Sequence, residues 1–202
     1  MSKPEMNKSF AETFPDIELG DNIQGLFKGV SVTSLGVSKK TGRLMIKATS
    51  DRLIPVDIIK KVESKLEEAL SVKVGLKIRF MLDMPLEEIL SACWGDIIAI
   101  AGNNIAASRG ILNGCEWALD SNRLDIRLAT VGEGILKSQG CDKLIENIIY
   151  DAFGRKVEVA FHNCVLDQDF QKKYAELKEN EEERISKLIM AEEHTNGNGK
   201  KK

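Results

Sequence analysis

Hydrophobic and polar positions follow the same order in two stretches of this chain, residues 29–81 and 114–161. Each stretch opens with two segments in which apolar and polar residues alternate, which is the pattern of half-buried β-strands. An amphipathic helical segment follows, and a third alternating segment closes each stretch near a phenylalanine. The repeated pattern predicts two small modules of one design, in which a helix lies across a sheet.

The first module is predicted over residues 23–82, with the element order ββαβ. Residues 44–49 and 74–80 alternate regularly, so one face of each strand should be buried and the other exposed. Pro55 suits the first turn of a helix, and apolar residues recur at helical spacing from Ile59 to Leu70. We expect this helix to cover the apolar face of the sheet.

The second module is predicted over residues 83–165, with the order αββααβ. An apolar helix follows Pro85, a Ser121-Asn122 turn joins two strands, and Gly140 separates two helices. Gly154 should end the second of these helices, because glycine readily adopts the left-handed conformation that closes a helix. Together the two modules predict an α+β fold.

The segments outside the modules differ from them in composition. Residues 1–22 contain two prolines and Gly20, which predicts a flexible arm with at most a short helix near residues 10–14. Residues 166–193 carry many charges and a sparse apolar stripe, which predicts a charged linker helix. Residues 194–202 combine turn formers with lysines and should be disordered.

The net charge of −2 hides an uneven distribution of charged residues. Residues 23–82 contain 12 basic and 5 acidic side chains, whereas residues 83–165 contain 7 basic and 12 acidic ones. The first module therefore carries +7 and the second −5. Charges of this size steer association, so the first module is expected to prefer acidic surfaces or phosphate groups.

Composition excludes several classes of function. The longest apolar run, residues 97–102, is far too short to cross a bilayer, and the first ten residues lack the apolar segment of a secretory signal. The four cysteines form no CxxC pair and the chain has two histidines, so neither a zinc site nor a disulfide framework is expected. We expect a cytoplasmic protein with no cofactor or metal in this segment and no membrane contact.

Three stretches are the most distinctive parts of the sequence. They are LFKGVSVTSLGVSKKTGRLMIKATSDRLIPVDIIKKVESKLEEAL, PLEEILSACWGDII, and LIENIIYDAFGRKVEVAFHN with the Glu/Lys-rich segment that follows it. In order, spacing and aromatic positions, residues 23–193 resemble the extreme amino-terminal region of the PolC-type DNA polymerase III alpha subunit, the replicative polymerase of low-GC Gram-positive bacteria. No invariant catalytic motif lies in this region.

The resemblance implies that the first module looks like the carboxy-terminal domain of the clamp-loader tau subunit and the second like a type II KH fold. In the family a linker then leads to an OB-fold and the polymerase proper. Those parts do not fit into 202 residues, so we expect a fragment or a truncated product. The parent is a DNA-directed DNA polymerase with a 3′–5′ exonuclease. This segment is expected to be a non-catalytic accessory region that docks replisome proteins such as the tau subunit, DNA, or both.

Basic side chains of the first module are the candidate contacts with DNA or a partner. If they converged on one surface, it would bind phosphates non-specifically and lose affinity as salt is added. An equally open interpretation is that they only solvate exposed strands and protect the sheet edges. The candidate residues are Lys39, Lys40, Arg43, Lys47, Lys73, Lys77 and Arg79.

An alternative function is a stand-alone KH-like module that binds single-stranded nucleic acid. A KH fold uses a GxxG loop between two helices, and here residues 136–141 keep only Gly140, with Lys137 as the one cation. The negative charge of the second module disfavours a phosphate contact at this loop. A hydrolase that uses Cys164 and His162 is a third alternative, although the sequence identifies no acid that would orient the histidine.

Overall fold

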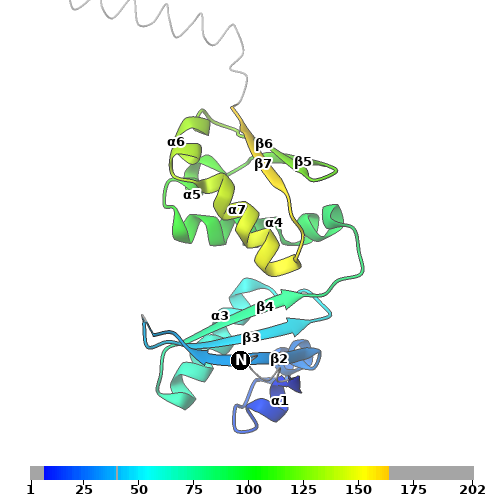
Figure 1. Ribbon diagram of the computed structural model, residues 1–202, viewed down its shortest axis with the longest axis vertical. Helices are drawn as coiled ribbons and strands as arrows, with labels where there is room; N and C mark the ends of the chain where they lie inside the picture. The colour runs from blue at the N-terminus through cyan, green and yellow to red at the C-terminus, as the bar shows by residue number, and fades with distance from the viewer. Residues whose placement is uncertain (1–6, 40, 164–202) are drawn as a thin grey trace, which may run out of the picture. The chain divides into compact units, whose positions relative to one another are not determined.

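The computed structural model describes residues 7–39 and 41–163, and these residues form two small sheets (Figure 1). The first sheet has the strand order β1-β2-β3-β4 and the second has the order β5-β6-β7. With helices in both modules, the predicted α+β fold class is confirmed. The helix predicted at residues 166–193 and the tail at 194–202 lie outside the described residues, as do Lys40 and Cys164.

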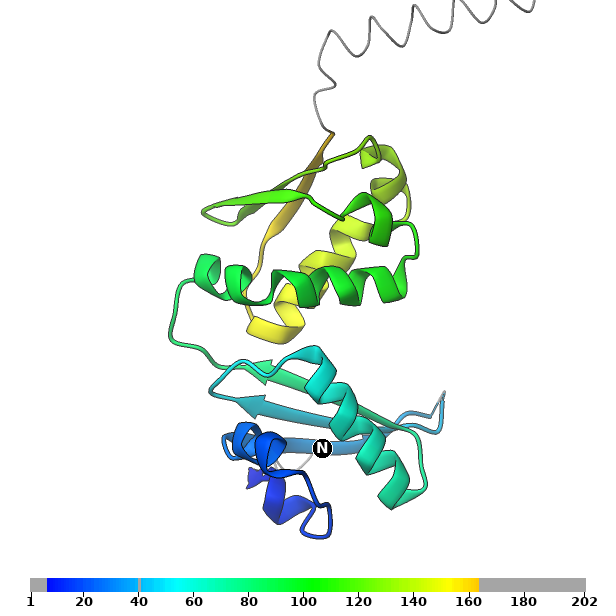
Figure 2. The same ribbon diagram turned by 180° about the vertical axis from the view of Figure 1, so that it is seen from behind.

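The first sheet consists of β1 (Lys8–Ser9), β2 (Val30–Val37), β3 (Leu44–Ser50) and β4 (Val74–Phe80). β2 pairs antiparallel with both β1 and β3, whereas β3 and β4 are parallel. Because parallel strands need a crossover connection, α3 (Val56–Leu70) runs between β3 and β4 and lies across the sheet (Figure 2).

The core of the first module lies between α3 and one face of this sheet. Val62 and Leu66 of α3 are fully buried against Ile46 of β3 and Val74 of β4. The same core also takes side chains from two helices near the amino terminus, α1 (Phe10–Thr13) and α2 (Asp21–Phe27). The module boundary predicted between residues 22 and 23 falls inside α2.

The second module contains two long helices, α4 (Leu86–Asn104) and α7 (Cys141–Phe153), and two short ones, α5 (Ser108–Ile111) and α6 (Glu133–Ser138). Its strands are β5 (Glu116–Asp120), β6 (Arg123–Arg127) and β7 (Glu158–His162). β5 and β6 are antiparallel, and β6 and β7 are parallel. Apart from the short α5, the order of elements is αββααβ, and its likeness to a type II KH fold stays a prediction.

Residues 7–39 and 41–163 belong to one compact unit, in which the end of α7 contacts β4. The ring of Phe153, the last residue of α7, stacks on Phe80 of β4 with a centroid distance of 5.8 Å. Phe153 packs against the cores of both modules. Within the described ranges, no helix combines the length and the apolar character that crossing a bilayer would require.

Candidate functional site

The basic residues predicted from the sequence are placed in separate groups. One group, Lys47, Lys77 and Arg79, lies on the face of the first sheet that is turned away from α3. Arg43 and Lys73 lie at the end of that sheet, and Lys39 lies at the tip of the β2–β3 hairpin. Lys137 belongs to α6 in the second module. The structure therefore gives two candidate surfaces on the first module instead of one continuous patch.

The first surface is the outer face of β3 and β4. On both strands, alternate residues point into the core, so Lys47, Lys77 and Arg79 point away from it. Lys47 is the register partner of Lys77, and Thr49 is the register partner of Arg79. The parallel pairing thus brings two ammonium groups to directly opposite positions on the same face.

The carboxy-terminal end of α7 meets this face. Lys77 Nζ lies 3.3 Å from Asp151 Oδ2, and the guanidinium of Arg79 donates to the backbone oxygens of Tyr150 and Asp151. That guanidinium also lies over the Tyr150 ring, 5.6 Å from its centroid. Because the last carbonyls of a helix carry partial negative charge, cations are favoured at this end.

A cleft of about 740 Å³ lies beside these contacts. Thr33, Lys47 and Thr49 line it from the sheet, together with Lys77 and Arg79. Its other wall is formed by Ile100 and Asn104 of α4 and by Ile148, Asp151 and Ala152 of α7.

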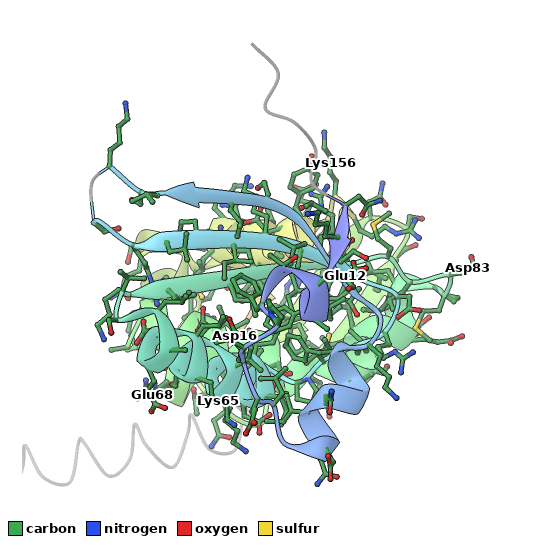
Figure 3. The ribbon with its side chains drawn as sticks, turned by 90° about the horizontal axis from the view of Figure 1, so that it is seen from below. Glu12, Asp16, Lys65, Glu68, Asp83 and Lys156 are labelled. Atoms are coloured by element: carbon green, nitrogen blue, oxygen red, sulfur yellow. The ribbon has the colours of Figure 1, made fainter. Side chains whose placement is uncertain are left out.

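The second surface is the hairpin-end surface, which we define as Val37, Lys39, Arg43, Leu70, Val72 and Lys73. The strand register places its parts at one end of the sheet, because Leu44 pairs with both Val37 and Val74. In Figure 3, Glu68, near the end of α3, lies toward the end of the sheet that carries the β2–β3 hairpin, and Asp83, which follows β4, lies toward the other end.

Three exposed apolar side chains belong to the hairpin-end surface, and others are exposed elsewhere, such as Met81 and Val131. Val37 is 67% exposed, Val72 44% and Leu70 39%. Lys39, at the tip of the β2–β3 hairpin, is also exposed. An apolar area with a basic rim is typical of a docking site for another molecule.

Glu67 of α3 holds two cations of this surface in place. Its carboxylate lies 3.2 Å from Lys73 Nζ and 4.0 Å from the guanidinium of Arg43, and it accepts a hydrogen bond from the backbone N–H of Val74. This backbone hydrogen bond, with the one from Lys73, lowers the pKa of Glu67 below its ordinary value. Two cations thus share one carboxylate.

The loop between α6 and α7 offers little to a phosphate group. Lys137, the one cation of residues 136–141, lies in α6 with its Nζ 2.6 Å from Glu133 Oε1, and this hydrogen bond lowers the pKa of the glutamate. Gly140 has a φ of +68° and joins the two helices. The predicted candidate Lys137 is therefore already paired within its own helix.

Several contact residues were missed by the sequence analysis. Asp151 and Tyr150 lie on the exposed side of an amphipathic helix, where polar and charged side chains are expected even when they contact no other element. Asp96 of α4 accepts a hydrogen bond from the backbone N–H of Val56, at the start of α3. No local signal marks this contact, because the two residues lie 40 positions apart.

His162 does have an acid beside it, which the sequence did not identify. Its Nε2 lies 2.7 Å from Asp125 Oδ1, and Arg123 also binds that carboxylate. The hydrogen bond from His162 is the larger cause that lowers the pKa of Asp125. The proposed nucleophile Cys164 lies outside the described residues, so the structure assigns no chemistry to this pair.

The cysteines that the structure describes are free thiols. Burial raises the pKa of Cys93 and of Cys141 to about 11, which keeps both thiols protonated at neutral pH. Over residues 7–39 and 41–163, no group of three or more His, Cys, Asp and Glu side chains is arranged to hold a metal ion.

Two protein families match the chain, one for each module. DNA polymerase III polC-type N-terminus I matches residues 9–80, and DNA polymerase III polC-type N-terminus II matches residues 92–202. The second match alone covers more than half of the chain.

The chain belongs to the PolC-type DNA polymerase III family. The resemblance found in the sequence is thereby confirmed, and the two modules are its amino-terminal regions I and II. The first match ends at Phe80, the last residue of β4, and the second begins at Ala92, within α4. A search of curated proteins found no match.

Proposed function

We propose that this amino-terminal region of a PolC-type polymerase is a non-catalytic platform that docks a replisome protein. The clamp-loader tau subunit is the partner expected from the resemblance, and the cytoplasm is the expected location. The observation that carries the proposal is the hairpin-end surface, where exposed apolar side chains lie among cations at the end of the first sheet.

The chemistry of this surface favours one kind of partner. Burial of Val37, Val72 and Leu70 on association would supply a hydrophobic driving force. The surrounding cations would select acidic residues around an apolar centre, because complementary charge determines specificity and association rate. The partner segment should therefore be apolar at its centre and acidic at its flanks.

The edge of β2 beside this surface supports the same proposal. β1 pairs only with Ser31 and Val32, so among the described residues no strand covers the outer edge of β2 from Thr33 to Val37. An open edge can accept an extended segment as an additional strand. β5 is also an edge strand, but Glu116 and Asp120 at its ends would repel an acidic segment.

The alternative function, binding of single-stranded nucleic acid through a KH-like loop, has weaker support. Lys137 is the one cation of that loop and is held by Glu133 at 2.6 Å. A phosphate would have to displace this carboxylate in a module that carries a charge of −5. Replacing Lys137 by Gln should therefore leave any nucleic-acid affinity of the chain unchanged.

The docking proposal is tested by titrating the full chain with purified tau subunit at low salt. The double variant Lys39→Glu/Val72→Ser removes one cation and one apolar contact from the hairpin-end surface. We expect it to weaken tau binding by at least about tenfold, because charge reversal at an interface adds repulsion to the lost contact. Calorimetry gives the dissociation constant directly.

The matched control makes the same substitutions in the second module, Lys156→Glu/Val131→Ser, where both residues are exposed. This control should bind tau as tightly as the parent chain. Equal losses in the two double variants would reject the hairpin-end surface. No interaction of the parent chain with tau would reject the docking proposal, and binding of single-stranded or primed duplex DNA alone would favour a nucleic-acid function.

A further inference from the structure

Lys47 and Lys77 form an unfavourable pair within the first sheet. They are register partners on β3 and β4, and both point away from the core. Like charges at directly opposite positions on neighbouring strands repel each other and destabilise a sheet. An anion placed near both ammonium groups would relieve this repulsion.

The structure supplies that anion for one lysine only. Lys77 has the Asp151 carboxylate at 3.3 Å. Lys47 takes part in none of the ion pairs formed by the described residues. Lys47 is an exposed residue that lines the cleft. The cleft lining contains three cations and a single carboxylate, so it keeps an excess of positive charge.

The remaining lining suits a ligand larger than a simple ion. The hydroxyl group of Thr49 and the second amide hydrogen of Asn104 provide neutral hydrogen-bonding groups near the cations, and Ile100 and Ile148 provide an apolar wall. The hydroxyl of Thr33 already donates to the backbone oxygen of Lys47 at 3.1 Å. Small-molecule sites typically have volumes of about 300–1,000 Å³ and combine apolar walls with a few polar groups. The volume of about 740 Å³ lies within this range.

We propose that this cleft binds a phosphate-bearing ligand, with one phosphate group seated between Lys47 and Lys77. The phosphate neutralises the lysine pair, and the adjoining sugar or base contacts the apolar wall. A phosphodiester of single-stranded DNA and the phosphates of a nucleotide share this chemistry. The site is separate from the hairpin-end surface, so this inference goes beyond partner docking and does not depend on it.

The position of Asp151 gives the proposal an unusual consequence. Its carboxylate forms an ion pair with Lys77 and lines the cleft in which the phosphate is expected. The carboxylate therefore competes with the ligand for that cation. Removal of the carboxylate charge should therefore strengthen binding, whereas removal of the Lys47 charge should weaken it. A substitution that merely loosened the fold would not increase affinity.

The experiment titrates the full chain at low salt with two probes, an eight-residue thymidine oligonucleotide without terminal phosphates and dATP. Binding is followed by backbone amide NMR shifts of Thr49 and Asp151, which lie on opposite walls of the cleft. We expect saturable shifts with at least one probe. Lys47→Gln should raise its dissociation constant by about tenfold, since it removes a charge-assisted contact, and Asp151→Asn should lower it severalfold.

The matched control is Lys60→Gln, which removes one exposed lysine charge from α3 on the other face of the sheet. It should change affinity only slightly. Binding of the oligonucleotide alone would identify a DNA strand as the ligand, and binding of dATP alone would identify a nucleotide. The proposal is overturned if neither probe produces saturable shifts, if Lys47→Gln behaves like Lys60→Gln, or if Asp151→Asn weakens binding.

Discussion

Glu67 links the basic end of the first sheet to the packing of its last strand. Its carboxylate accepts the backbone N–H of Val74 at 2.9 Å and is held by Lys73 at 3.2 Å. The backbone oxygen of the same residue, Val74, accepts a hydrogen bond from the guanidinium of Arg43 at 2.6 Å. Arg43 and Lys73 thus have a structural role as well as a place on the hairpin-end surface.

The depressed pKa of Glu67 predicts how the stability of the fold depends on pH. The backbone hydrogen bond from Val74 is the largest cause of this depression. A carboxyl whose pKa is lower in the folded state stabilises the protein above its unfolded pKa, and this contribution is lost as pH falls through the folded value. Glu67→Gln should therefore unfold at lower urea concentration than the parent at pH 7, and the difference should shrink below about pH 4.

Glu68→Gln is the matched control, since Glu68 is the exposed neighbour of Glu67 on α3. Its urea midpoint should follow that of the parent chain at both pH values. A difference between Glu67→Gln and the parent that stayed constant from pH 7 to pH 3 would show that the ionised carboxylate contributes nothing.

At the scale of elements, both modules protect their last strand in the same way. Glu63 and Glu67 of α3 accept hydrogen bonds from the backbone N–H groups of Leu76 and Val74 in β4. In the second module, Glu146 of α7 accepts one from the N–H of Val159 in β7. In each case the helix of the crossover connection satisfies backbone donors on an edge strand, which would otherwise be open to pairing with other chains.

The sequence repeat predicted the elements of both modules but not this contact. Alternation and helical spacing report which face is buried, and they located α3, β4, α7 and β7 correctly. The three glutamates read as ordinary exposed charges, because a hydrogen bond to another element leaves no periodic signal. For the same reason, only part of the candidate site could be predicted. Exposure of Lys47, Lys77 and Arg79 followed from alternation, whereas the approach of α7 depended on tertiary packing.

The carboxy-terminal end of α7 depends on one glycine. Gly154 has a φ of +67°, and its N–H donates to the backbone oxygen of Tyr150 at 2.9 Å. A side chain in this left-handed conformation is strained, so Gly154→Ala should lower the free energy of unfolding by about 1–2 kcal/mol. Gly134→Ala is the opposite case, because Gly134 lies within α6 with open space around it. It should stabilise the chain slightly, and thermal unfolding of the two variants tests both signs.

At the scale of the whole molecule, the contacts between the two modules include an ion pair and a stack of two aromatic rings. The basic module carries +7 and the acidic one −5, and Lys77 pairs with Asp151 where they touch. Both side chains of this pair are 62% exposed. Exposed ion pairs contribute little because water and salt screen them. The stacked rings of Phe80 and Phe153 therefore supply more of the stability of this contact.

Phe153 should thus determine whether the modules unfold together. It packs against both cores, and its replacement by alanine should cost about 2–4 kcal/mol, somewhat less than for a fully buried phenylalanine. Because the lost contact joins the modules, the parent chain should unfold in one cooperative transition and Phe153→Ala in two. Urea titrations followed by native-state hydrogen exchange distinguish the two cases, since amides of β4 and β7 would then show different opening free energies.

The matched control for this experiment is a substitution inside one module. Ile145 is fully buried in the core of the second module, and Ile145→Val removes one methylene group there. It should destabilise the chain by about 0.5–1.5 kcal/mol while the single transition is kept. Phe153→Ala would contradict the prediction if it also unfolded in one transition, with β4 and β7 opening at the same free energy. Contacts other than this ring would then join the modules. The hydrogen bond between Asp96 and the backbone N–H of Val56, at the start of α3, would be the next contact to remove.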